Sequence, residues 1–178
     1  GEQIAFVGTG PGETIGEQTV VIDARGKTVI PGLIDGHTHL AWLSGIDEFL
    51  KYAMKGGTTT IITETMEAFA VRGYDGVTDF LAALKDQPIK IFGVAPAMVS
   101  ISKTAFGIPR DILGKLLERD DIVGLGESYW QAVIQEPDRM LPIFQDTLAS
   151  GKTLEGHSAG AGGKKLAAYA ATGISSCH

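Results

Sequence analysis

The chain has 178 residues, a net charge of −6 and a pI near 5.1. An acidic chain without a basic run is a poor nucleic-acid ligand, because affinity for duplexes rests on Lys and Arg side chains that neutralise phosphates. Hydrophobic residues make up 44% of the chain and charged residues 20%, which excludes a disordered protein. The single cysteine, Cys177, excludes an internal disulfide framework.

No targeting or membrane segment is visible in the sequence. The first 16 residues hold no Lys or Arg and no apolar run of the roughly 7–15 residues that a signal peptide contains, so they do not resemble one. No stretch reaches the roughly 20 apolar residues that span a bilayer. We therefore expect a cytoplasmic protein with no membrane partner. Because the chain opens inside an expected strand and stops directly after another, we also expect both of its ends to be cut.

The first 31 residues are predicted to form part of a small β domain. Short β-branched or apolar runs, separated by glycine and proline turn signals, predict strands. These expected strands cover residues 3–7, 19–22 and 28–30. The pattern changes after Pro31 and Gly32, so we assign residues 1–31 to this partial domain and residues 32–178 to a second one.

Strand and helix patterns alternate from residue 32 onward. The expected strands are short and apolar without polar alternation, which is typical of a parallel sheet buried on both faces. They cover residues 33–37, 58–63, 89–94, 122–125, 153–155 and 174–177. Segments with helical spacing of apolar residues cover 46–55, 78–85, 110–119, 141–149 and 164–171. The pattern predicts an α/β fold, an incomplete parallel (β/α)8 TIM-type barrel of about six strands, because a full barrel needs about 200–250 residues.

All four histidines are predicted to lie at strand ends. His37 and His39 end the first strand, Glu127 the fourth, His157 the fifth and His178 the sixth. In a parallel barrel the carboxyl ends of the strands meet at one mouth. Residues i and i+2 of an extended segment face the same side, so His37 and His39 can grip one ion. A lone histidine is more often a surface or core residue, and the clustering at strand ends is what favours a metal site.

Residues 31–40, PGLIDGHTHL, resemble the amidohydrolase superfamily. Its hallmark is a PG-[LF]-[IV]-D-x-H-x-H segment on the first barrel strand. The segments GLGE at 124–127, LEGHSAG at 154–160 and AATGISSCH at 170–178 look most like the adenine deaminase branch. The resemblance covers essentially the whole chain.

The resemblance implies a binuclear site for two divalent metal ions, of Zn, Fe or Mn. His37 and His39 match the ligands of one ion, Glu127 matches the carboxylate that bridges both ions, and His157 and His178 match the ligands of the second ion. Hydantoinases and dihydroorotases carry a carboxylated lysine at the bridging position, so Glu127 favours the deaminase branch. The family's eighth-strand aspartate, a ligand and proton shuttle, is expected beyond residue 178. No catalytic residue is therefore assigned, and we expect the isolated chain to be inactive.

The resemblance also implies an enzyme that hydrolyses C–N bonds of a small-molecule substrate. The expected reaction is deamination of adenine, or of a related purine or aminated heterocycle, by a metal-bound hydroxide. A cyclic amidase of the dihydroorotase or hydantoinase type is the alternative. A second alternative is a catalytically incompetent fragment whose unpaired edge strands favour association, and a homo-oligomer stays open. Ala41 and Trp42 follow His39 where adenine deaminases tend to carry an acidic residue, which leaves purine specificity open.

Two further residues are candidates for substrate binding. Glu64 ends the second predicted strand and is a candidate to contact the substrate or a metal-bound water, although a buried or helix-capping carboxylate is the commoner case. Tyr129 follows Glu127 closely and is a candidate to line the pocket, although an aromatic residue after a strand as often packs into the core.

Overall fold

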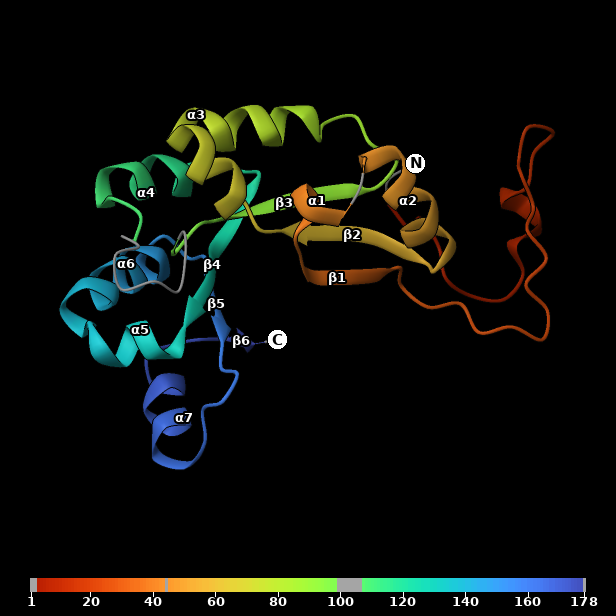
Figure 1. Ribbon diagram of the computed structural model, residues 1–178. Helices are drawn as coiled ribbons and strands as arrows, with labels where there is room; N and C mark the ends of the chain where they lie inside the picture. Colours follow the sequence, from red (N-terminus) through yellow and green to blue (C-terminus); the bar gives the residue numbers. More distant parts are fainter. Residues whose placement is uncertain (1–2, 44, 99–106, 178) are drawn as a thin grey trace. The chain divides into compact units, whose positions relative to one another are not determined.

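The computed structural model describes residues 3–43, 45–98 and 107–177, which form two units, Gly1–Pro31 and Gly32–His178. The second unit is an α/β sheet whose strands follow one another in chain order. These strands are β1 (Leu33–Thr38), β2 (Thr58–Thr63), β3 (Lys90–Ala95), β4 (Ile122–Tyr129), β5 (Thr153–His157) and β6 (Ser176–Cys177). Every neighbouring pair is parallel. The sheet curls into half a barrel (Figure 1), which confirms the predicted incomplete barrel of six strands.

A helix connects each strand to the next, as the crossover between two parallel strands requires. The α-helices in the described part of the chain are α1 (Leu40–Leu43), α2 (Ile46–Lys55), α3 (Met66–Ala83), α4 (Arg110–Leu117), α5 (Trp130–Gln135), α6 (Pro137–Ala149) and α7 (Gly163–Ala170). Helices α3, α4 and α6 lie against the same side of the sheet (Figure 1). None of the described helices combines the length and the apolar character that crossing a membrane would need.

Two apolar clusters hold these layers together. The larger cluster joins α3, α4 and α6 to the middle strands, and its fully buried members include Leu113, Phe144 and Leu154. The smaller cluster packs Leu50 of α2 against Ile61 of β2. Burying a Leu, Ile or Phe side chain contributes about 1.5–3 kcal/mol each, so the two clusters fix the backbone from which the strand ends project.

Most of the predicted elements of the second unit are present, with shifted ends. Helix α2 and strand β2 have the bounds that the sequence predicted, whereas α3 begins at Met66 and the sequence predicted a start at residue 78. Two glycines inside this part of α3 weaken its helical sequence pattern. Gly73 adopts a φ of 59° at a kink, and at Gly76 a Cβ would press on the carbonyl group of Ala68. The short helices α1 and α5 were not predicted.

The first unit differs from its expectation. Residues 3–31 contain no strand, and their one helical turn is η1 (Pro11–Thr14), so the strands expected at 3–7, 19–22 and 28–30 are not formed. Val7, Val20 and Val29 have exposed fractions above 80%. A β-branched run becomes a strand only when a neighbour hydrogen-bonds to it and covers its apolar face, and residues 3–31 show neither. Their assignment to a separate β domain stays a prediction.

Candidate metal centre

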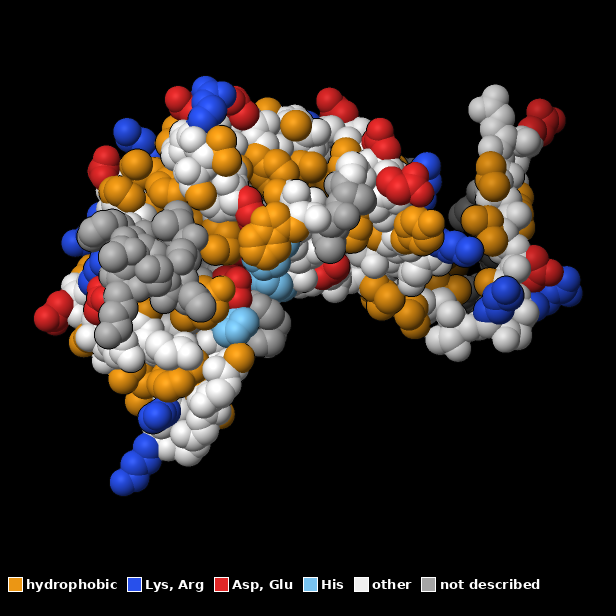
Figure 2. Space-filling model, in the orientation of Figure 1, with side chains coloured by type: hydrophobic (Ala, Val, Ile, Leu, Met, Phe, Trp, Pro, Cys, Tyr) orange, Lys and Arg blue, Asp and Glu red, His pale blue; other side chains and the backbone are white. Residues whose placement is uncertain are grey.

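Four of the five predicted metal ligands lie at the carboxyl ends of three strands. His37 is the penultimate residue of β1, and His39 directly follows that strand. Glu127 lies two residues before the end of β4 at Tyr129, and His157 is the last residue of β5. Figure 2 shows histidine and acidic side chains gathered on one face of the sheet unit. The fifth predicted ligand, His178, lies outside the described residues.

The strand geometry brings His37 and His39 together as the i, i+2 spacing predicts. Their Nε2 atoms lie 3.2 Å apart, and the two rings meet edge to face. Thr38 between them is buried, and its carbonyl oxygen accepts hydrogen bonds from the Glu64 amide at 2.8 Å and from the Thr63 hydroxyl. These bonds fasten the end of β1 to β2, so the backbone beneath both imidazoles is fixed.

Glu127 lies between the His37–His39 pair and His157. One of its carboxylate oxygens is 3.6 Å from Nε2 of His39, and the other pairs directly with Nδ1 of His157. Its side chain is only 5% exposed. A carboxylate with one oxygen toward each side of a cluster has the arrangement that a group shared by two ions requires.

Three more carboxylates support this cluster, of which the sequence singled out only Glu64. Glu155 of β5 lies 2.9 Å from Nδ1 of His37, and Glu67 of α3 lies 2.6 Å from Nδ1 of His39. The side chain of Glu64 accepts a hydrogen bond from the backbone N–H of Glu127. Glu155 could have been found by the rule that found the histidine pair, because it precedes His157 by two residues on the same strand. No comparable spacing rule indicates Glu67.

Gly126 makes room for the Glu64 side chain. A Cβ at this position would lie 2.7 Å from the carboxyl carbon of Glu64 and still closer to its oxygens. Glu64 is 1% exposed, and this burial raises its pKa to about 8, although the Glu127 amide works in the opposite direction. The glycine before Glu127 therefore permits a buried carboxyl group beside the Glu127 backbone.

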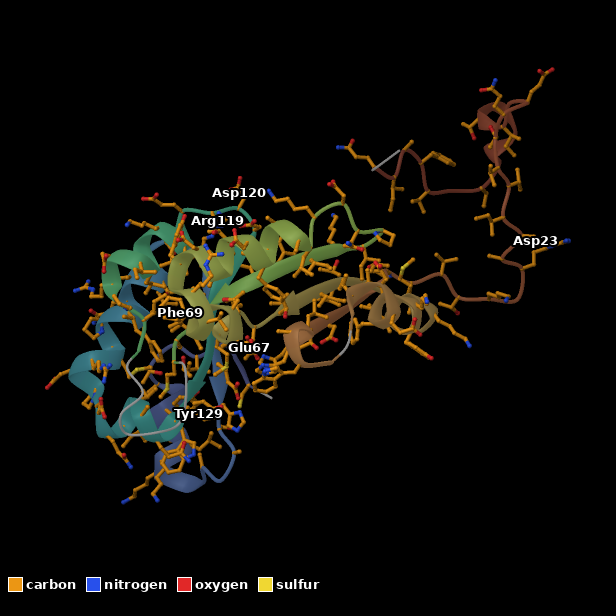
Figure 3. All side chains as sticks on the ribbon, turned by 45° about the horizontal axis from the view of Figure 1, so that its top comes forward. Asp23, Glu67, Phe69, Arg119, Asp120 and Tyr129 are labelled. Atoms are coloured by element: carbon orange, nitrogen blue, oxygen red, sulfur yellow. The ribbon has the colours of Figure 1, made fainter. Side chains whose placement is uncertain are left out.

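Aromatic rings border the histidines. Trp42 of α1 stacks on His39 with ring centroids 4.6 Å apart and an interplanar angle of 7°. The ring of Tyr129 lies 4.8 Å from that of His157. Burial, followed by the negative charge of Glu127, raises the pKa of Tyr129 to about 12, so its phenol keeps its proton at neutral pH. Glu67 and Tyr129, labelled in Figure 3, come from α3 and β4.

A hydroxyl on the outer helix α7 joins the ends of β4 and β5. The Tyr169 hydroxyl donates to the carbonyl of Ser128 and accepts from the amide of His157 at 2.9 Å. Gly156 leaves space for this ring, because a Cβ there would overlap the Tyr169 hydroxyl. The separation of Glu127 from His157 thus depends on a residue outside the cluster.

The side chains present fit divalent metal ions. Two nitrogens bound to one ion at about 2.0–2.1 Å each lie at most about 4.2 Å apart, and the 3.2 Å between the two Nε2 atoms meets this limit. Ligand atoms of His37, His39 and Glu127 all lie within 4.8 Å of one another. One buried oxygen each of Glu64, Glu67 and Glu155 has no hydrogen-bond partner among the described residues. This excess of buried acceptors is what a cation would compensate.

Comparisons with known proteins identify the family of the chain. A sequence profile described as the amidohydrolase family matches residues 20–125. Adenine deaminases of Rubrobacter xylanophilus and Dehalococcoides mccartyi are 32% and 34% identical to the chain, each over 100% of it and 31% of the relative. The adenine deaminase of Cenarchaeum symbiosum is 29% identical over 100% of the chain and 30% of its own length. The chain thus spans about a third of the length of these curated relatives.

Among solved structures, a β-aspartyl dipeptidase from Fervidobacterium islandicum matches with a TM-score of 0.49 and 19% identity, over 78% of this chain and 39% of that one. The profile match covers more than half of the chain, and it includes the segment around His37 and His39 that carried the resemblance. The chain therefore belongs to the amidohydrolase family, and within that family its sequence resembles the adenine deaminases.

Proposed function

We propose that this protein is a metal-dependent hydrolase that removes the amino group of adenine or of a related purine or aminated heterocycle. The observation that carries the proposal is the meeting of His37, His39, Glu127 and His157, from three strands, around one point. The curated relatives named adenine deaminases support this choice of substrate class.

Two groups of side chains would hold two ions. His37 and His39 would bind the first ion, His157 together with the predicted His178 would bind the second, and Glu127 would contact both. Imidazole and carboxylate ligands suit Zn, Fe or Mn. Divalent ions held by these residues would lower the pKa of bound water toward neutrality, which is the chemistry that would supply a hydroxide nucleophile.

The remaining side chains would shape the pocket and hold its ligands. Tyr129 keeps its phenolic proton and can donate it in a hydrogen bond to a ring nitrogen or carbonyl oxygen of the substrate. Glu64 is buried below Glu127, so we assign it the support of the bridging carboxylate through the Glu127 amide. The indole of Trp42, 67% exposed and stacked on His39, offers an apolar surface beside the histidine pair.

The overall reaction consumes one water per amino group. The oxygen of water bonds to the ring carbon that carries the amino group, and the C–N bond breaks. One proton of water leaves with the amino group as ammonia, and the other stays on the product. A cyclic amidase would use the same nucleophile on a ring amide and would release no ammonia. Ammonia release from adenine, compared with ring opening of dihydroorotate or hydantoin, therefore separates the two activities.

The test is Glu127→Gln in the full protein, with metal content and ammonia release as readouts. The amide keeps the size of the side chain but loses the negative charge that two ions would share, so we expect less than half of the wild-type metal and a loss of activity of at least about 100-fold, in line with interactions worth 2.7 kcal/mol or more in a transition state. Glu118→Gln, an exposed change at the end of α4, is the matched control. Two ions per chain and full turnover in Glu127→Gln would refute the proposal.

A further inference from the structure

Each histidine of the His37–His39 pair is held on its Nδ1 side by a carboxylate from another element. Glu155 of β5 lies 2.9 Å from Nδ1 of His37, and Glu67, the second residue of α3, lies 2.6 Å from Nδ1 of His39. An ionised carboxylate only accepts hydrogen bonds, so each Nδ1 must carry the proton. Both contacts join the pair to parts of the chain that are distant in sequence.

These contacts determine which nitrogen of each ring faces the site. With Nδ1 protonated, the free lone pair of each neutral imidazole is on Nε2. The two Nε2 atoms are the ones that lie 3.2 Å apart. Two lone pairs at this distance repel each other unless a proton or a cation lies between them. The carboxylates therefore hold the rings in an arrangement that a cation stabilises.

We propose that Glu67 and Glu155 are positioning residues that fix the tautomer and ring orientation of His39 and His37 for metal binding. This inference deepens the proposed function and rests on it. Outer carboxylates that hydrogen-bond to ligating histidines raise the basicity of the ligand and keep its ring in place. Glu67 comes from the start of α3 and Glu155 from β5, so each histidine of the pair is oriented by a different element.

Glu67 and Glu155 are buried, and their burial argues against a role in packing alone. The side chains of Glu67 and Glu155 are 12% and 8% exposed, and the second oxygen of each has no partner among the described residues. Burying a carboxylate with incomplete hydrogen bonding costs stability. A residue kept only for packing would be more stable as a neutral side chain of the same size. The charge facing each Nδ1–H is consequently a feature of the site.

The experiment compares Glu67→Met, Glu67→Gln, Glu155→Met and Glu155→Gln with the exposed control Glu118→Gln. The first measurement is Zn²⁺ affinity of the full metal-free protein, by competition with a chelator. The second is the ¹⁵N and ¹H spectrum of the histidine rings in the same metal-free protein. Methionine removes the acceptor, whereas glutamine keeps an oxygen that can accept the Nδ1 proton but removes the charge.

We expect Zn²⁺ affinity to fall about 10–100-fold in each methionine variant and by less in each glutamine variant. In the spectra, wild type should show slowly exchanging protons on Nδ1 of His37 and His39. Glu67→Met should lose the His39 signal alone, and Glu155→Met the His37 signal alone. The glutamine variants should keep both signals, which separates loss of orientation from loss of folding.

The results distinguish failure of this inference from failure of the proposed function. Absence of the Nδ1 protons in wild type, or unchanged spectra and affinity in both methionine variants, would overturn the positioning roles whatever the protein hydrolyses. If the methionine variants lose the expected Nδ1 signals and the wild type binds Zn²⁺ but releases no ammonia from adenine, the positioning roles stand and the proposed deaminase activity is refuted.

Discussion

Charged side chains have different partners at the amino and the carboxyl ends of the sheet. At the amino end of β4, Arg119 forms a two-point ion pair with Asp121, with N–O distances of 2.7 and 2.8 Å, and Lys152 donates to the carbonyl of Arg119 at 2.7 Å. At the carboxyl end, Glu155 and Glu67 are buried against His37 and His39. The ion pair at the amino end is complete within the chain, whereas one oxygen each of Glu67 and Glu155 has no hydrogen-bond partner among the described residues and is suited to the proposed cation.

The largest effect that would sharpen this contrast is the stabilisation of the carboxyl end by a metal ion. Zn²⁺ or Mn²⁺ at 100 times its dissociation constant should raise the free energy of unfolding by about 2.7 kcal/mol, because the ion binds the folded state and not the unfolded one. Urea unfolding with the metal and with a chelator measures this difference. Glu127→Gln should show a much smaller gain. Equal stabilities with and without metal in wild type would break the comparison.

A second change tests the space that Gly126 leaves for the Glu64 side chain. Gly126→Ala places a methyl group against the Glu64 carboxyl and should cost about 1–3 kcal/mol in the free energy of unfolding, as overpacking does. Gly114→Ala in α4 is the matched control, since a Cβ there meets no atom within 4 Å. That control should be neutral or slightly stabilising, because alanine restricts the unfolded chain. A loss of similar size in both variants would show that the Gly126 contact is not specific.

The smallest effect is expected at the amino end. Arg119→Gln should cost at most about 1 kcal/mol, since both partners are about a quarter exposed and such pairs contribute little. The Arg119 guanidinium holds the pKa of Asp121 below its ordinary value of 3.8. A group with a lowered pKa stabilises the fold above its unfolded pKa, and this contribution is lost as the pH falls through the folded pKa.

The difference between wild type and Arg119→Gln should therefore be present at neutral pH and should vanish as the pH falls below 3.8 and through the lowered pKa of Asp121. Unfolding curves measured across this range check the sign. The exposed pair of Arg72 with Asp79 provides a control through Arg72→Gln, which should change stability even less. A difference that grows as the pH falls would contradict the assigned cause.

Local patterns in the sequence predicted the sheet well, and contacts between distant residues explain what they missed. Helix α2 and strand β2 could be located because their apolar spacing and flanking glycines are local signals. The start of α3 was missed because Gly73 and Gly76 argue against a helix until the packing against Ala68 is known. The strands expected within residues 3–31 were predicted wrongly for the converse reason, since a favourable local pattern needs a partner to become a strand.

The site divides in the same way. His37 and His39 could be paired from their spacing alone, and Glu127 and His157 from their places at strand ends. Their roles as metal ligands, with His178, stay a prediction. Glu67 could not be found, because nothing near it in sequence indicates that the start of α3 reaches His39. Gly126 likewise reads as a turn or a bulge until Glu64 is seen beside it.

The Tyr169 hydroxyl has a consequence for how such a protein can evolve. The Tyr169 side chain of α7 joins the ends of β4 and β5 by two hydrogen bonds, and it thereby fixes the separation of Glu127 from His157. A substitution that slides or tilts α7 would alter that spacing without touching any group that meets the substrate. In the proposed metal centre, selection acting on α7 could therefore change the affinity for a cation, or the choice of cation, while every proposed ligand stays the same.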